Sequence, residues 1–168
     1  MMPVMKKTAG AAIPPEIRIG SIVARVRHML KEFKRTVPEG TASQISHPYG
    51  LEMFESYGAV FIQVADQECF KKLVVQLPGQ QYPSHRHLHK QENYHVLAGD
   101  LEVEVEGAIK MLHSDDRLTI HPGETHGFRS WKGMIMEETS TSDIKGDSFY
   151  TDKAIPFDSS ARKSAVIV

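Results

Sequence analysis

The sequence predicts an all-β domain, a sandwich or barrel, preceded by one α-helix. Between residues 59 and 138, apolar residues either alternate with polar ones or form short runs, and turn signals rich in glycine, proline, aspartate and serine separate these segments. Many short strands at such spacing are typical of a β-sandwich or a β-barrel. The expected strands span residues 59–65, 73–77, 94–97, 101–105, 117–121 and 134–138.

The first 58 residues predict a tail, a helix and a connection. Residues 1–14 contain many small residues and prolines without periodicity, so we expect a flexible tail. From Pro15 to Phe33, apolar residues recur at steps of three and four, which predicts one amphipathic helix that ends near Pro38 and Gly40. Residues 38–58 contain prolines, glycines and serines, and we expect them to form an irregular connection.

We expect this helix to pack on the outside of the barrel or on a partner subunit. A helix on a membrane surface is the alternative, but the apolar stripe is narrow and lacks bulky aromatic residues. The chain then divides into a tail (1–14), a helix with its connection (15–58) and a barrel (59–168), all within a single domain.

Two later segments refine the expected barrel. Leu101–Glu106 alternates apolar residues with glutamates, so one face of this strand is expected to be dry and the other wet. The apolar run Ala165–Val168 is expected to be an edge strand or a subunit contact, because an exposed apolar edge invites aggregation. We therefore expect a homodimer.

Composition excludes several classes of partner. The formal net charge is −1 and there is no long basic run, which argues against nucleic acid and anionic membranes as partners. A single cysteine, Cys69, excludes an internal disulfide. The N-terminus is too weakly apolar for a signal peptide, and no apolar run approaches the ~20 residues that span a bilayer. We expect a cytoplasmic protein.

A candidate metal site lies in the segment that begins at Pro83. His85 and His87 are two residues apart, so in an extended segment both imidazoles project from one face. Glu92 follows after four residues, which allows a tight turn to return its carboxylate on an adjacent antiparallel strand. A third imidazole can come from His126 far downstream. First-row divalent metals accept three imidazoles and one carboxylate.

These residues stand in the order of a known pair of motifs. The first is Gly79, five residues, His85-x-His87, four residues, Glu92, six residues and Gly99, and the second is Pro-Gly-x-x-His ending at His126. This order resembles the paired motifs of the cupins. The second motif departs from the commonest form at His121 and Ser130, neither of which is an expected ligand. The resemblance implies a cupin jelly-roll barrel, with the N-terminal amphipathic helix outside it, and a bound metal.

A narrower resemblance concerns the sugar cupins. His85-x-His87-x-x-Lys90-x-Glu92, together with Glu137–Thr141 and Asp147–Phe149, is similar to the D-lyxose isomerase group. That group interconverts an aldose and a ketose through an enediol, and its acid–base residues match Lys90 and Glu138. Strand alternation lets only one of Glu137 and Glu138 point inward, and alignment with the group selects Glu138.

Two other functions stay open. The run from His47–Gly50 to Arg162 and Lys163 looks equally like the cupin domain appended to N-acetylneuraminate-type synthases. That resemblance implies a non-catalytic sugar-binding module in nonulosonate or surface-sugar biosynthesis. The same ligand set also supports Fe-dependent dioxygenase chemistry in other cupins.

The expected ligands also bear on the metal and the substrate. A set of three nitrogens and one oxygen without cysteine suits an ion of higher coordination than structural zinc. On a six-coordinate ion, two positions would stay open for adjacent oxygens of a small sugar. We expect Mn²⁺ first, with Fe²⁺, Co²⁺, Ni²⁺ and Zn²⁺ as alternatives. Further candidates for contact with the sugar are Phe128, Trp131, Tyr82, Lys71 and Arg129.

Overall fold

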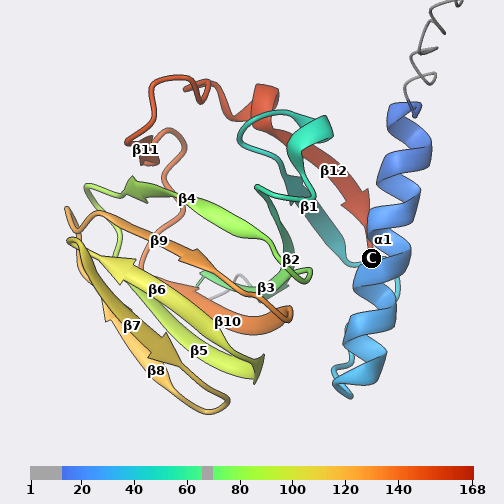
Figure 1. The fold of residues 1–168 in the computed structure, drawn as a ribbon, viewed down its shortest axis with the longest axis horizontal. Helices are drawn as coiled ribbons and strands as arrows, with labels where there is room; N and C mark the ends of the chain where they lie inside the picture. Colours follow the sequence, from blue (N-terminus) through green and yellow to red (C-terminus); the bar gives the residue numbers. More distant parts are fainter. Residues whose placement is uncertain (1–12, 66–69) are drawn as a thin grey trace, which may run out of the picture.

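Two antiparallel β-sheets face each other, and one helix lies outside them (Figure 1). The computed structural model describes residues 13–65 and 70–168. The expected all-β jelly roll with an N-terminal helix is confirmed. Cys69 and all but the last two residues of the expected tail lie outside the described residues.

Sheet order is that of a jelly roll, because strands distant in sequence are neighbours in space. The seven-stranded sheet runs in the order β12 (Lys163–Ile167), β1 (Ala42–Ser46), β2 (Ala59–Ala65), β3 (Phe70–Gln76), β10 (Met134–Ser140), β5 (Glu92–Gly99) and β8 (Arg117–Ile120). The five-stranded sheet runs β11 (Phe149–Tyr150), β4 (Gln81–Arg86), β9 (His126–Arg129), β6 (Leu101–Val105) and β7 (Ala108–Leu112). Two short 3₁₀ helices, η1 (Leu51–Met53) and η2 (Ser159–Arg162), complete the described elements.

One strand lies where an irregular connection was expected. Residues 42–46 form β1, which pairs with β2 on one side and with β12 on the other. The prediction of irregular structure over 38–58 is therefore wrong at this point. The sequence Ala-Ser-Gln-Ile-Ser has one large apolar residue, Ile45, so the strand signal was weak. The C-terminal run does form an edge strand, as expected.

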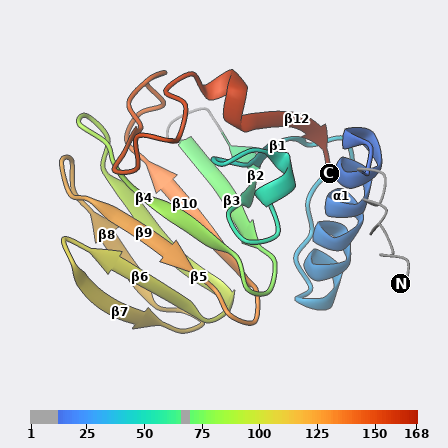
Figure 2. The ribbon, with the colours of Figure 1, turned by 45° about the horizontal axis from the view of Figure 1, so that its top comes forward.

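The helix α1 (Pro15–Glu32) covers the outer face of the seven-stranded sheet (Figure 2). Its buried residues are Ile22, Val26, Met29 and Leu30. They join one apolar cluster with sheet residues that include Ile45, Val60, Ile62, Leu73, Val75 and Ile135. The expected packing on the outside of the barrel is confirmed. No described helix is long and apolar enough to cross a lipid bilayer.

The helix ends earlier than its prolines and glycines predicted. Lys34 adopts a left-handed conformation with φ of 53°, and the N–H of Arg35 donates to the carbonyl of Leu30 at 2.8 Å. This is a Schellman ending, in which glycine usually takes the left-handed position. Because a lysine takes it here, the sequence carried no visible stop before Pro38.

The strands β3 and β10 are buried on both faces at residues 73–76 and 134–136, which explains their continuous apolar runs. Leu73 and Val75 face the helix, whereas Val74 belongs to a second cluster between the two sheets. The strand Leu101–Val105 belongs to the other sheet, and there Leu101 and Val103 are buried in the second cluster. A sheet covered on both faces needs apolar residues at every position, whereas a half-covered strand alternates.

Candidate metal centre and cavity

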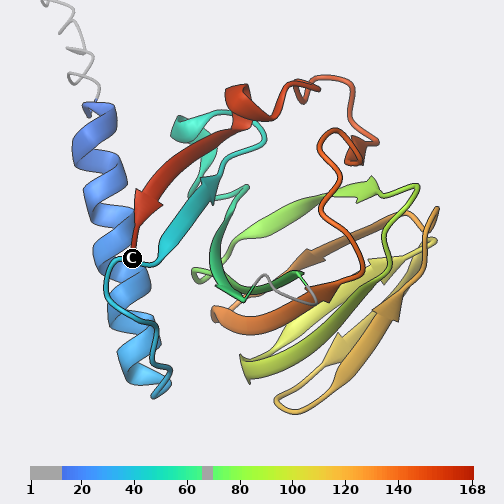
Figure 3. The same ribbon diagram turned by 180° about the vertical axis from the view of Figure 1, so that it is seen from behind.

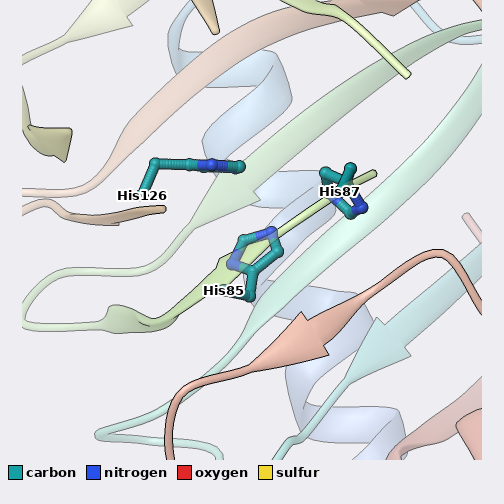
Figure 4. Close-up of side chains that lie close together, drawn as sticks. All are labelled: His85, His87 and His126. Carbon is teal, nitrogen blue, oxygen red and sulfur yellow. The ribbon is translucent and has the colours of Figure 1, made fainter. Parts of the chain in front are cut away.

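Three imidazoles from the five-stranded sheet converge on one point (Figure 4). His85 lies near the end of β4, His87 is the first residue after β4, and His126 is the first residue of β9. The two strands are neighbours, and their register places His85 opposite His126. One ligand nitrogen from each ring lies within 4.8 Å of the others, and all three residues are buried. The group is therefore a candidate metal site.

Main-chain carbonyls orient all three rings. In each ring Nδ1 lies against a carbonyl oxygen, which can only accept, so Nδ1 carries the proton and donates it. The pairs are His85 with Pro83 at 2.9 Å, His126 with Glu124 at 3.0 Å, and His87 with Asp147. The lone pair of each Nε2 is left free, which is the arrangement found in metal-bound histidines.

Glu92 completes the donor set from the opposite sheet. Its Oε1 lies 3.2 Å from Nε2 of His87, and its Oε2 lies 3.2 Å from Nε2 of His126. Nε2 of His126 is buried and makes no hydrogen bond to the described residues. A carboxylate facing unprotonated ring nitrogens is unfavourable without a cation between them. The donors therefore fit a divalent metal ion.

The path by which Glu92 reaches the site differs from the prediction. A tight turn was expected to place it on an antiparallel strand adjacent to His85. Instead β4 and β5 belong to different sheets, so the connection crosses the barrel. The expectation is wrong about the route, because β4 already has β9 and β11 as its neighbours.

Burial and neighbouring charges shift the titration of two donors. Burial lowers the pKa of His85 well below its usual value, and the imidazoles of His126 and His87 lower it further. Burial alone would raise the pKa of Glu92, but the ammonium group of Lys90 holds it well below its usual range. A neutral ring and an ionised carboxylate are the forms that bind metals.

Lys90 lies between two carboxylates. Its Nζ is 2.5 Å from Oε1 of Glu92 and 3.8 Å from Oε1 of Glu138. Burial alone would lower the pKa of Lys90, but the carboxylates of Glu138 and Glu92 outweigh it and raise the pKa above its ordinary value. Lys90 is therefore an ammonium group held beside the donor set.

Glu138 and Glu137 point to opposite sides of β10. Glu138 is buried and lies opposite Tyr94 on β5 and Lys72 on β3, with its Oε1 3.6 Å from Nζ of Lys72. Glu137 pairs instead with Lys71 at 3.0 Å, and neither of these two lines the cavity. The structure thus brings Glu138, not Glu137, to the predicted site.

A cavity of about 720 Å³ opens in front of the donors. Of the predicted metal ligands and acid–base residues, all line it except His126, which is buried. Aromatic rings line much of the rest: Phe61, Tyr82, Tyr94, Phe128 and Tyr150. The cavity therefore combines aromatic surfaces with many polar and charged side chains, and convergent polar groups of this kind give a small-molecule site its specificity.

The weaker candidates for contact with the sugar divide into two groups. Tyr82 and Phe128 line the cavity. Lys71, Arg129 and Trp131 do not, since Lys71 pairs with Glu137 as described and Arg129 pairs with Glu102 at 2.8 Å and stacks over Trp131 at 4.5 Å.

Asp147 holds the loop after β4 that begins with the candidate ligand His87, a role that the sequence did not reveal. Its carboxylate accepts hydrogen bonds from the N–H groups of Leu88 at 2.8 Å and His89 at 3.1 Å, and its carbonyl accepts from His87. Burial alone would raise the pKa of Asp147, but the two N–H groups lower it below its usual value. In Figures 1 and 3 the segment that carries it runs from β10 to β11, between the two sheets. In the sequence, only the similarity of Asp147–Phe149 to the D-lyxose isomerase group pointed to this residue.

Comparison with known proteins agrees with this fold. Residues 72–133 match the family model described as "Cupin domain". An L-ribose isomerase variant of Acinetobacter sp. DL28 in complex with L-ribose superposes with a TM-score of 0.69 at 13% identity, over 87% of this chain and 95% of that one. The L-ribose isomerase of Cellulomonas parahominis with L-ribose gives 0.66 at 14% identity, over 88% and 96%. No curated protein sequence matches. At such identities the likeness shows the fold alone.

Proposed function

Because residues 72–133 place this chain in the cupin superfamily, we propose that it is a metal-dependent sugar isomerase that interconverts an aldose and a ketose through an enediol. The observation that carries the proposal is the pair Lys90 and Glu138, an ammonium and a carboxylate 3.8 Å apart beside a set of metal donors. The likeness to L-ribose isomerases over most of both chains supports it.

The metal would be held by His85, His87, His126 and Glu92, with Mn²⁺ as the expected ion. A bound divalent ion acts as a Lewis acid that makes the hydrogen next to a carbonyl more acidic. The fit rests on the three free Nε2 lone pairs and on the carboxylate that faces two of them.

Two residues of the chain would move the protons. Glu138 takes the proton from C2 of the aldose and returns it to C1, which yields the ketose. Lys90 donates a proton to the carbonyl oxygen O1 and accepts the proton of the hydroxyl at O2. One proton moves from carbon to carbon and one from oxygen to oxygen, so no redox partner is needed.

Replacing Glu138 by glutamine tests the proposed base. Glu138→Gln should retain its metal and lower the exchange of the sugar's C2 proton with D₂O by at least about 100-fold, followed by NMR over a panel of aldoses that includes D-lyxose and L-ribose. Glu137→Gln, one residue away on the opposite face, is the matched control and should exchange at the wild-type rate. Unchanged exchange in Glu138→Gln would exclude this base.

The acid–base pair favours an isomerase over the two other functions. A sugar-binding module or an Fe²⁺ dioxygenase needs neither Lys90 nor Glu138 beside the donors. Calorimetric binding of sugars without turnover would favour the module, and substrate-dependent O₂ uptake by the Fe²⁺-loaded protein would favour the oxygenase.

We also propose a homodimer joined through β12, an edge strand on which Ile167 is exposed.

A further inference from the structure

One wall of the cavity carries more positive charge than its own carboxylates balance. The cavity is lined by the cations Lys72, Lys90, Lys145, Arg162 and Lys163 and by the carboxylates Glu92, Glu138 and Asp143. Lys90 and Lys72 are paired with the glutamates. Lys145 and Asp143 carry one charge of each sign and are both exposed, so the surplus lies at Arg162 and Lys163, where η2 joins β12. A divalent metal at the histidines would increase the positive charge further.

Arg162 is a buried cation whose partners are all neutral. It is 3% exposed. Its guanidinium donates to the carbonyls of Pro156 at 2.7 Å and Phe157 at 3.0 Å, and to the hydroxyl of Tyr150 at 3.3 Å. No carboxylate of the described residues lies within 4.0 Å of it. A buried charge without a counterion is costly, so this arrangement favours an anion from outside the chain.

Lys163 follows Arg162 in the chain and lines the same cavity. It makes no hydrogen bond or ion pair to the described residues that would neutralise it. Burial lowers its pKa, and the charges of Lys72 and Arg162 lower it further, while Asp143 acts in the opposite direction. Asp143 is exposed, so its charge is screened by solvent and compensates little.

The surplus charge lies close to the candidate metal centre. The ring of Tyr150 is near both: its centre is 5.3 Å from that of His85 and 4.9 Å from the guanidinium carbon of Arg162. A five- or six-carbon sugar derivative can therefore reach from the donors to the guanidinium. A neutral sugar would leave this end of the cavity uncompensated.

We propose that the substrate is an anionic sugar whose phosphate or carboxylate binds Arg162 and Lys163 while its reacting carbons lie beside Glu138. The choice of an anionic sugar rests on the proposed isomerase function, and the anion site itself rests on the charges of the cavity. Charge-assisted hydrogen bonds to arginine and lysine are the usual means of binding such groups.

Matched pairs of ligands test the anion site by calorimetry on the full-length metal-loaded protein. The pairs are D-ribose with D-ribose 5-phosphate and D-glucose with D-glucuronate, and inorganic phosphate is titrated alone. At least one anionic member should bind at least about tenfold more tightly than its neutral partner. A larger affinity ratio for the ribose pair identifies a sugar phosphate as the ligand class, and a larger ratio for the glucose pair identifies a sugar acid.

A pair of lysine variants assigns that preference to the cavity wall. Lys163→Gln removes one charge without breaking a contact to the described residues, so it should fold and should bring the affinity ratio toward one. Lys71→Gln removes the same charge outside the cavity and should leave the ratio unchanged. Arg162→Gln is informative only as a second step, because its three hydrogen bonds also hold the fold.

Three results would overturn the inference: equal affinity within both pairs, no binding of any anion, or an unchanged ratio in Lys163→Gln. The two proposals can fail separately. An anion preference without isomerisation of any sugar would leave the anion site standing and remove the isomerase. Isomerisation of neutral sugars without an anion preference would leave the isomerase standing and remove the anion site.

Discussion

Asp147 connects the chain after β10 to the loop that begins with the candidate metal ligand His87. It accepts two main-chain hydrogen bonds with its carboxylate and one imidazole hydrogen bond with its carbonyl. Groups that orient a ligand in this way commonly change metal affinity by 10- to 100-fold. Asp147 therefore acts through His87 and is a positioning residue.

Exchange of this carboxylate for an amide is the first test at the scale of single residues. In Asp147→Asn, an NH₂ group replaces one acceptor oxygen and faces an N–H group of the loop. We expect metal affinity to fall by about tenfold, measured by competition with a chelator. Asp115→Asn, at a side chain that is 96% exposed, is the control. Equal affinity in the two variants would remove the positioning role.

Three of the four candidate donors could be proposed from the sequence because their spacing is local. His85, His87 and Glu92 lie within eight residues of one another. Asp147 acts from sixty residues away and through its backbone, so no side-chain pattern revealed the contact with His87. The catalytic roles of Lys90 and Glu138 remain predictions, although both side chains lie in the cavity.

At the scale of elements, α1 and the outer face of the seven-stranded sheet bury each other. The helix was predictable because its apolar residues recur at the helical period. Its end was not, since Lys34 takes a conformation that usually requires glycine. The strand β1 was not predictable either, because its position between β12 and β2 depends on long-range pairing rather than on its own polar sequence.

Truncation of one helix residue measures this packing. Ile22 is 1% exposed and lies in the cluster between helix and sheet. Ile22→Ala should lower the free energy of unfolding by about 2–5 kcal/mol, measured by urea denaturation. Ile17→Ala, on the same helix but 63% exposed, should change it by less than about 0.5 kcal/mol. Similar losses in both would mean that the helix does not pack through this face.

At the scale of the whole molecule, the candidate metal centre joins the two sheets. His85 lies in β4, His87 directly follows β4, and His126 lies in β9, all in or next to the five-stranded sheet. Glu92 comes from β5 in the seven-stranded sheet. An ion bound to all four would link the two sheets. The sequence suggested the four residues as metal ligands but not this link between sheets. From the sequence, Glu92 was expected on a strand adjacent to β4.

Metal should therefore stabilise the complete fold. At a free metal concentration 100 times the dissociation constant, binding to the folded state adds about 2.7 kcal/mol, which corresponds to a rise of roughly 5–10 °C in melting temperature for a chain of this length. Calorimetric scans with EDTA and with added Mn²⁺ would measure the rise. His126→Gln should lose most of it. A rise of equal size in that variant, or none in the wild type, would contradict this assignment of the donors.

The anchoring of the imidazoles to backbone oxygens has a consequence for how this scaffold can diversify. No amino-acid replacement deletes a carbonyl, so changes of side chain at Pro83 or Glu124 leave the acceptors of His85 and His126 in place. The cavity wall, by contrast, is built from side chains such as Phe61 and Lys163, which mutation alters freely. Substitutions in the cavity wall can therefore change which ligand the cavity selects without altering the orientation of the three imidazoles.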